Sequence, residues 1–191
     1  RNIRELLAVV DELWEELSQS DFEPAGFEVE FGPQGQMPPV SIPGGAMPAY
    51  LRGFVDRLDL YTKNGSTYVR VVDYKPGRKD FDYCDVFNGV GLQLLLYLFA
   101  LSRDSSGSFA KMLSCKGKPL PAGVLYFSFG SQTKAKDAAD DKRKDDADAV
   151  RLKTEKRIKR SGLLLKDKEI LTAMENTLEG RYLPIKVNKD G

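Results

Sequence analysis

The alternation of apolar and polar positions in residues 51–77 predicts a β-hairpin. Two runs rich in Val, Leu, Tyr and Phe flank Asn64-Gly65, a dipeptide that favours the positive φ angles of a type I′ turn. With Asn64 and Gly65 as the two loop residues, the numbers of each cross-strand pair add to 129, so Asp56 lies opposite Asp73. A loop of three or four residues is the alternative, and it would shift the register and turn one of these acids toward solvent.

The two faces of this hairpin carry different charges. The face with Asp56, Asp73 and Lys75 is otherwise apolar, and we therefore expect it to be buried. The opposite face has Asp59 across from Arg70, which is typical of a partly solvated face with an ordinary cross-strand ion pair. Only on the first face do the charges need a further explanation.

Hydrophobic periodicity predicts further elements around the hairpin. Residues 3–18 show the spacing of an amphipathic helix, with a capping box at Asn2 and Glu5. We interpret its apolar stripe as core packing; the stripe consists of Ile3, Leu6, Leu7, Val10, Leu13, Trp14 and Leu17. The other predictions are a strand over 27–31 with Glu28 and Glu30 on one face, a loop over 32–48, a buried helix over 90–101 within the segment 86–102, a central strand over 121–129 and a helix over 167–178.

Two polar side chains interrupt the apolar helix. Gln93 and Tyr97 are four residues apart and so share one face. Their polar ends can point together at whatever the hairpin holds. Alternatively, each finds a partner inside the core, as buried polar groups usually do.

Residues 131–160 differ from the rest of the chain. Lys, Arg, Asp and Ala dominate this segment, and its last third is strongly basic. Such composition is typical of a linker or an exposed helix, and a phosphate-contacting arm is the alternative. We expect it to separate a core over 1–130 from a C-terminal helix and tail over 161–191.

Composition limits the chemistry. The 191 residues are 41% hydrophobic and 30% charged, which suits one globular domain, and the net charge of +1 gives no overall attraction to nucleic acid. No apolar run approaches the roughly 18 residues of a membrane span, so no membrane partner is expected. Cys84 and Cys115 lack zinc spacing, which indicates reduced thiols and a cytoplasmic location. The absence of histidine excludes Ser-His-Asp and Cys-His catalysis. Because the first residue is Arg, we expect a piece of a longer polypeptide.

The opposed acids suggest a metal site. Directly opposed Cβ atoms lie about 5 Å apart, and two carboxylates at that separation repel by about 3 kcal/mol at an effective dielectric of 20. A divalent cation between Asp56 and Asp73, with the ammonium of Lys75 nearby, would turn this repulsion into a set of hard oxygen ligands suited to Mg²⁺ or Mn²⁺.

Three motifs resemble the PD-(D/E)XK nuclease superfamily. Segment 53–57 (Gly-Phe-Val-Asp-Arg) resembles the second acidic motif of RecB-like nucleases, segment 73–77 (Asp-Tyr-Lys-Pro-Gly) their Asp-Tyr-Lys signature, and segment 93–97 (Gln-Leu-Leu-Leu-Tyr) their Gln-x-x-x-Tyr helix motif. Stretches 22–32, 122–127 and 161–165 are similar to the C-terminal nuclease domain of AddB, the B subunit of AddAB-type ATP-dependent helicase–deoxyribonucleases. The resemblance implies an α/β, restriction-endonuclease-like core with a mixed β-sheet flanked by helices, in the order αβββαβ.

The resemblance also implies roles for individual residues. Asp56 and Asp73 would ligate the metal, with the backbone carbonyl of Tyr74 as a third ligand, and Lys75 would position and polarise the attacking water. Gln93 and Tyr97 would hold the site or a nucleotide phosphate. Glu28 matches a recurrent strand glutamate of the family and would have a supporting role. The family carries a metal-associated His and an iron–sulfur cluster bound by four cysteines, and we expect both in the full-length protein but not in this chain.

By this resemblance, the chain is an Mg²⁺-dependent deoxyribonuclease, an exonuclease module of a helicase–nuclease complex that processes double-strand breaks for recombinational repair. DNA and an AddA-like A subunit would be its partners. One alternative is a nuclease fold that has lost catalysis and serves as a DNA-binding or scaffold module. Another is an enzyme that uses the same carboxylates for a metal-bound small molecule, which the absence of a Gly-rich phosphate loop disfavours.

Overall fold

A computed structural model of the chain describes residues 2–42, 47–77, 79–103, 107–113, 115, 119–129 and 160–185. Its centre is a five-stranded sheet in the order β1-β4-β5-β6-β7, in which β5 and β6 run parallel and the other neighbours antiparallel. The strands are β1 (Glu23–Phe31), β4 (Gly53–Lys63), β5 (Ser66–Pro76), β6 (Leu120–Phe129) and β7 (Ser161–Leu164). This mixed sheet confirms the predicted α/β class.

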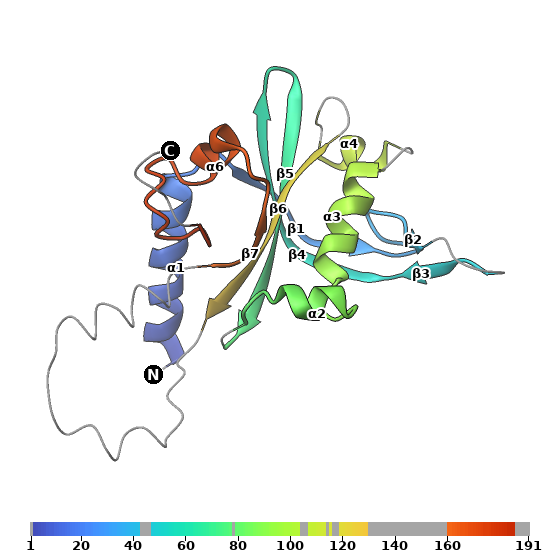
Figure 1. Cartoon of the computed structure of the whole chain (residues 1–191), viewed down its shortest axis with the longest axis horizontal. Helices are drawn as coiled ribbons and strands as arrows, with labels where there is room; N and C mark the ends of the chain where they lie inside the picture. Colours follow the sequence, from blue (N-terminus) through green and yellow to red (C-terminus); the bar gives the residue numbers. More distant parts are fainter. Residues whose placement is uncertain are drawn as a thin grey trace, which may run out of the picture.

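Helices cover both faces of the sheet (Figure 1). On one side lie α1 (Asn2–Ser18) and α6 (Lys168–Met174), and on the other lie α3 (Gln93–Arg103) and α4 (Ser108–Leu113). The short helix α2 (Tyr83–Phe87) lies near the end of β5, and β2 (Val40–Ile42) pairs with β3 (Ala49–Leu51) outside the main sheet. Among the helices that the structure describes, none is long and apolar enough to cross a membrane.

The predicted hairpin is confirmed in its turn and its register. Asn64 and Gly65 have φ angles of 50° and 77°, as a type I′ turn requires. Pairing runs from Lys63 with Ser66 to Arg57 with Val72, and each pair adds to 129. The regular ladder ends there, one pair before the two acids.

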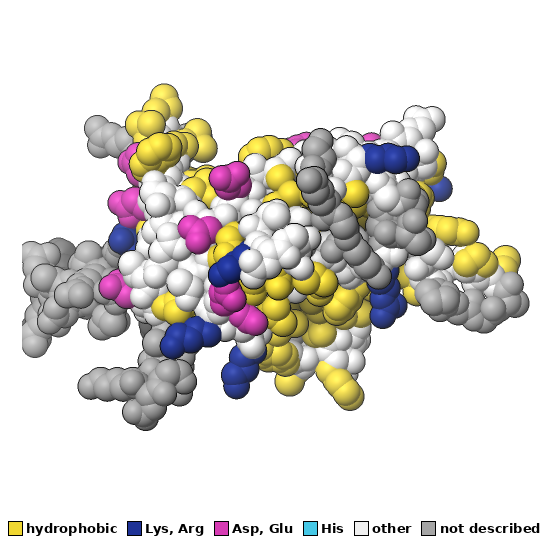
Figure 2. Space-filling model, turned by 90° about the horizontal axis from the view of Figure 1, so that it is seen from above, with side chains coloured by type: hydrophobic (Ala, Val, Ile, Leu, Met, Phe, Trp, Pro, Cys, Tyr) yellow, Lys and Arg dark blue, Asp and Glu magenta, His cyan; other side chains and the backbone are white. Residues whose placement is uncertain are grey.

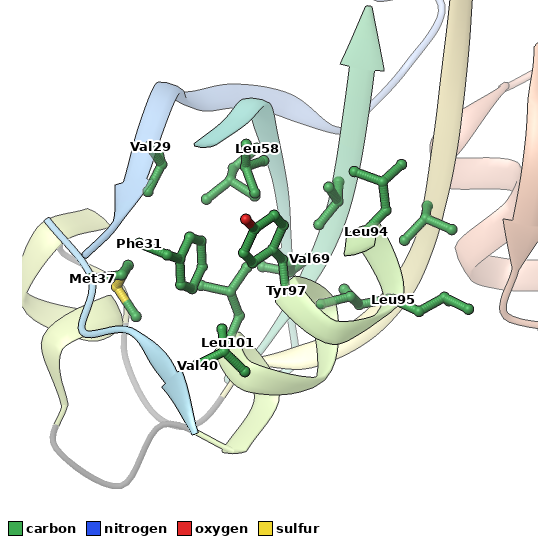
Figure 3. Close-up of a cluster of buried hydrophobic side chains, with 14 of the residues drawn as sticks. Val29, Phe31, Met37, Val40, Leu58, Val69, Leu94, Leu95, Tyr97 and Leu101 are labelled. Carbon is green, nitrogen blue, oxygen red and sulfur yellow. The ribbon is translucent and has the colours of Figure 1, made fainter. Parts of the chain in front are cut away.

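The side chains between the sheet and α3 form the first of two cores (Figure 3). The ring of Tyr97 stacks on that of Phe31 with centroids 4.5 Å apart. Around them pack aliphatic side chains from both layers, including Val29, Leu58, Val69, Leu94, Leu95 and Leu101. This packing fixes α3 over the hairpin face that carries the acids.

The buried helix predicted over 90–101 is confirmed as α3, which begins three residues later than predicted and is preceded by the separate short helix α2. Gly89 and Gly91 have φ angles of 82° and 71° and lie between α2 and α3. A left-handed backbone cannot continue an α-helix, so the chain turns there and α3 begins anew at Gln93.

The prediction that the Asp59–Arg70 face is partly solvated is also wrong. Arg70 donates from Nε and an Nη atom to Asp59 Oδ2 at 2.9 and 2.7 Å, and both side chains are fully buried. The neighbouring Arg57 is 1% exposed and also bonds to Asp59 Oδ2, at 3.0 Å. Helices α1 and α6 cover this face, which the spacing within the hairpin could not reveal.

The interpretation of the α1 stripe as core packing is wrong for most of its members. Ile3, Leu6, Leu7, Val10 and Trp14 are all more than half exposed, and only Leu13 and Leu17 are half-buried. The side of α1 that faces the sheet instead carries Glu12 and Glu16, which accept hydrogen bonds from Arg160 at 2.6 to 3.0 Å. Buried arginines without carboxylate partners would cost several kcal/mol, so the acidic side of the helix turns inward.

Smaller differences concern the ends of elements. Strand β1 begins at Glu23, earlier than predicted, and Glu28 has a φ of 48°, which breaks the expected alternation, so that Glu28 is exposed and Glu30 half-buried. Strands β2, β3 and β7 were not predicted, and the helix predicted over 167–178 ends at Met174. Of the charged segment 131–160 only Arg160 is described, and it is 3% exposed. The rest of that segment and the side chains of the predicted capping box lie outside what the structure describes.

The surface seen from the hairpin end carries mixed charges (Figure 2). Among the described residues visible in this view, basic and acidic side chains are interspersed, with hydrophobic side chains between them. This matches the net charge of +1. Any affinity for nucleic acid must therefore come from a local arrangement.

Candidate active site

The hairpin opens at Asp56. The register, continued by one pair, puts Asp56 opposite Asp73, and the next pair would be Val55 with Tyr74. Instead of bonding to the Val55 carbonyl, the backbone N–H of Tyr74 donates to Asp56 Oδ2 at 2.7 Å. The carboxylate thus takes the acceptor position of a main-chain carbonyl, which holds the Asp56 side chain against β5.

Asp73 and Lys75 lie next to this opening and form an ion pair. Lys75 Nζ is 2.6 Å from Asp73 Oδ2. The geometry of this contact is not that of a regular hydrogen bond, and among the described residues this buried oxygen has no hydrogen-bond partner. Burial raises the pKa of the Asp73 carboxyl above its usual value; the Lys75 ammonium lowers it in part, and the charge of Asp56 raises it again. The Lys75 side chain is 42% exposed, so its ammonium remains accessible to a substrate.

The residues at this opening fit a small hard cation. Tyr74 points its N–H toward Asp56, and the N–H and C=O of one strand residue lie on the same edge, so the Tyr74 carbonyl also faces the opening. Within the described residues no cluster of three or more Asp, Glu, Cys or His side chains could hold a metal. Two carboxylates and one carbonyl leave positions for water, which is the way Mg²⁺ usually binds.

The Gln-x-x-x-Tyr pair contacts the start of β4. Gln93 Nε2 donates to the Tyr97 hydroxyl at 3.1 Å, which confirms that the two side chains share a face. Gln93 is exposed, whereas Tyr97 is fully buried. Gly53 has a φ of 152°, and a Cβ at this position would overlap the Tyr97 hydroxyl and lie 3.1 Å from Gln93 Nε2. The pair therefore fixes the backbone of β4 three residues before Asp56.

On the other face of the sheet, a hydrogen bond between Arg57 and Tyr74 stabilises the two strands beside the opening. Arg57 donates to the Tyr74 hydroxyl at 2.8 Å, and its guanidinium lies 5.6 Å from the centre of the Tyr74 ring. Arg57 follows Asp56 and Tyr74 follows Asp73, so this bond ties the two strands together beside both acids. Because Arg57 also bonds to Asp59, the buried charges of this face support the geometry of the opposite one.

Tyr126 is a site residue that the sequence did not reveal. It lies on β6, level with Asp73 in the parallel ladder, and so points to the same face. The residue is 6% exposed. Burial raises the pKa of its hydroxyl, the charge of Asp73 raises it further, and the Lys75 ammonium lowers it in part. The sequence indicated only that Tyr126 lies on a predicted strand. It did not show which strand pairs with that strand, so Tyr126 could not be placed beside Asp73.

Glu28 lies on β1, the strand that pairs with β4 on the side away from β5. The register of β1 with β4 puts it across from Asp56, but its φ of 48° marks a kink, and its side chain is exposed. Positive φ at a residue other than glycine is uncommon and costs free energy. The supporting role expected for Glu28 therefore rests on its position alone.

Comparison with known families matches residues 2–186 to the model of the PD-(D/E)XK nuclease superfamily. The chain belongs to the PD-(D/E)XK nuclease superfamily. The mixed sheet with helices on both faces is consistent with the restriction-endonuclease-like core of this superfamily, and the motif roles of Asp56, Asp73 and Lys75 stay a prediction.

Within the superfamily, the chain is similar to proteins named as the B subunit of an ATP-dependent helicase/deoxyribonuclease. It is 35% identical over 181 residues to that of Clostridium acetobutylicum, 33% over 183 residues to that of Clostridium tetani, and 35% over 181 residues to that of Caldanaerobacter subterraneus subsp. tengcongensis. Each comparison covers 93% of this chain. The chain spans only 14 to 15% of the length of these relatives.

Replacing Gly53 by alanine is expected to destabilise the chain by about 2–4 kcal/mol, because the new methyl group meets the Tyr97 hydroxyl and the backbone is strained. Tyr97→Phe in the same chain removes the hydroxyl, and we expect it to recover about 1 kcal/mol or more. Urea denaturation of the two single variants and the double variant measures this coupling. Gly65→Ala is the control for φ strain alone, since nothing lies within 4 Å of its added Cβ. Additive effects of the two changes would contradict the contact.

The raised pKa of Asp73 predicts a pH dependence of stability without metal. Between the unfolded-state pKa, about 4, and the higher folded-state value, the folded chain binds more protons, so stability falls as pH rises through this window. Asp73→Asn removes the buried charge and its repulsion with Asp56, and we expect it to stabilise the metal-free chain by about 1 kcal/mol at pH 7 but not below pH 4. Urea denaturation in EDTA at both pH values measures this difference. Asp11→Asn, at an exposed position of α1, is the control; a variant less stable than wild type at pH 7 would contradict the account.

Proposed function

We propose that the chain is an Mg²⁺-dependent deoxyribonuclease that hydrolyses phosphodiester bonds as an exonuclease. The observation that supports this most is the opening of the hairpin, where Asp56 and Asp73 face each other and Lys75 lies 2.6 Å from an Asp73 oxygen. A scaffold gains nothing from an acid pair in which burial raises the pKa of the Asp73 carboxyl. A metal-dependent hydrolase needs such a pair.

In this proposal Asp56, Asp73 and the Tyr74 carbonyl hold the cation. Tyr74 has two tasks, because its N–H orients the Asp56 carboxylate while its carbonyl faces the opening. Bound there, Mg²⁺ supplies Lewis-acid polarisation of a phosphoryl oxygen and activation of water. No covalent enzyme intermediate is required.

Lys75 orients the attacking water and stabilises the negative charge that develops during the reaction. Its ammonium reaches the acid pair, and its partial exposure leaves room for a substrate. Gln93, exposed at the start of α3, is the member of the helix motif that can contact a nucleotide phosphate. Tyr97 is buried and acts as a positioning residue through Gln93 and Gly53.

The relatives, whose names describe the B subunit of an ATP-dependent helicase/deoxyribonuclease, suggest the setting of this activity. We propose that the chain works in the cytoplasm within a longer polypeptide, paired with an AddA-like A subunit, where it trims DNA ends at double-strand breaks for recombinational repair. An iron–sulfur cluster and a metal-associated His would come from other parts of that polypeptide.

A cleavage assay tests the proposal. Single-stranded oligonucleotides labelled at either end are incubated with the 191-residue chain in Mg²⁺, with Asp56→Asn as the inactive variant and Asp11→Asn as the control for loss of an exposed carboxylate. Exonuclease action gives short products from one end, and Asp56→Asn is expected to lose at least about 100-fold in rate. A wild-type chain that binds the oligonucleotides without cutting them would support the scaffold alternative.

A further inference from the structure

The start of α3 has backbone amide groups for which the described part of the chain provides no acceptor. Its N-cap residue is Leu92, whose carbonyl accepts from the N–H of Leu96 at 2.9 Å but whose side chain cannot cap the helix. For the amides of Gln93, Leu94 and Leu95 no acceptor is present among the described residues. By contrast, α2 and α6 each begin with an aspartate that accepts from backbone amides. The 11-residue helix α3 therefore presents a positive end that the described residues leave open.

Two contacts place this helix end over the acid pair. On one side Gln93 and Tyr97 meet Gly53, three residues before Asp56. On the other side a Cβ on Gly91 would lie 3.9 Å from the hydroxyl oxygen of Tyr126. The start of α3 thus spans from β4 to β6, with β5 between them, at the end of the sheet where β5 terminates (Figure 1).

Tyr126 directs an unused donor toward the same point. Its ring is buried in the first core, the whole residue is only 6% exposed, and among the described residues nothing hydrogen-bonds to its hydroxyl. Such a hydroxyl normally has a partner when the ring is buried. Its neighbour Asp73 is already paired with Lys75, whose ammonium offsets the charge of the carboxylate nearest to the hydroxyl.

We propose that the Tyr126 hydroxyl and the open amides at the start of α3 form a subsite for a DNA phosphate next to the scissile one. Helix N-termini with glycine-containing entry turns bind phosphates through their backbone N–H groups, and here Gly89 and Gly91 shape the entry turn. The inference rests on the proposed nuclease function, and it adds a contact that would fix the register of the strand in the active site. Tyr126 contacts the substrate through its hydroxyl alone.

The test measures binding of a single-stranded oligonucleotide to the 191-residue chain by fluorescence anisotropy, with Ca²⁺ in place of Mg²⁺ to prevent cleavage. Tyr126→Phe removes only the hydroxyl and is expected to raise the Kd about tenfold, as loss of a hydrogen bond to a charged group does. Tyr68→Phe, a half-buried tyrosine on the opposite face of β5, is the matched control and should change the Kd less than twofold. Thermal denaturation verifies that both variants are folded.

A second arm identifies the phosphate. Oligonucleotides with one neutral methylphosphonate at successive positions should lose about tenfold in affinity for wild type at one position beside the cleavage point. With Tyr126→Phe, the loss at that position should shrink to about twofold or less, because the partner is already missing. A purely structural role would instead raise the Kd evenly and leave the profile along the strand unchanged, and that result overturns the subsite.

Cleavage in Mg²⁺ separates the subsite from the nuclease function. If Asp56-dependent cleavage occurs but Tyr126→Phe has the wild-type methylphosphonate profile, the subsite is wrong and the nuclease function stands. If the profile changes as expected but no cleavage occurs, the subsite stands and the nuclease function is wrong.

Discussion

Replacing Lys75 by alanine is expected to lower the rate of phosphodiester cleavage in saturating Mg²⁺ by roughly 10³-fold. The ammonium lies 2.6 Å from Asp73 Oδ2 and is the only lysine or arginine side chain paired with either acid in the part of the chain that the structure describes. Removing a charged group that stabilises the transition state typically costs 10²–10³ in rate. The affinity for Mn²⁺ should change little, because Lys75 does not ligate the metal.

The hairpin offers a matched control for this change. Lys63 lies on the same hairpin near its tip, its side chain is also 42% exposed, and it also pairs with one carboxylate, that of Glu169. Lys63→Ala should therefore leave the cleavage rate within about twofold of wild type. Single-turnover cleavage of an end-labelled oligonucleotide compares the two variants. Similar rates for Lys75→Ala and Lys63→Ala would show that the ammonium beside the acids has no role in the chemistry.

The second large effect is on stability. Arg70→Met is expected to lower the free energy of unfolding by about 3–5 kcal/mol, because Asp59 would keep its buried charge and lose the bonds at 2.7 and 2.9 Å. Both side chains are fully buried, so water cannot replace the guanidinium. Urea denaturation at neutral pH measures the difference.

Arg181→Met is the control for an ion pair of the same length at the surface. Arg181 also lies 2.7 Å from its carboxylate, that of Glu15, but the two side chains are 48% and 54% exposed. Such a pair contributes about 0–1 kcal/mol. Equal losses for Arg70→Met and Arg181→Met would contradict the conclusion that the charged face of the hairpin is a buried structural network.

The hairpin was predictable because its information is local. Asn64-Gly65 determines the turn, the turn determines the register, and the register brings Asp56 and Asp73 together over a distance of 17 residues in the sequence. The same reasoning put Gln93 and Tyr97 on one face of a helix, and their hydrogen bond confirms it. These are the parts of the site in which spacing alone decides geometry.

The burial of side chains was predicted wrongly where it depends on partners far away in the sequence. The charges of Asp59 and Arg70 suggested solvent, but the cover over that face comes from α1 and from Arg160, which is 144 residues away from its partner Glu16. The apolar stripe of α1 suggested burial for the same reason, since the spacing of leucines does not reveal which side of a helix meets buried arginines. In both cases the ion pairs across long sequence separations decided the outcome.

Tyr126 illustrates a third kind of difficulty. On a mostly apolar strand a tyrosine is indistinguishable from a core residue until the neighbouring strand is known. Its place beside Asp73 follows from the parallel pairing of β6 with β5, and its approach to α3 follows from the break at Gly91. The sequence predicted neither the pairing nor the break.

Calorimetric titration of the 191-residue chain with Mn²⁺, beside Asp73→Asn, tests the central claim most directly. The account predicts binding by the wild-type chain that is lost, or weakened at least about 100-fold, in the variant, because one of two carboxylate ligands is gone. Binding of equal strength by both proteins would place the metal elsewhere and contradict the account. The absence of binding by the wild-type chain, with its fold verified by circular dichroism, would equally contradict a metal site made by this hairpin.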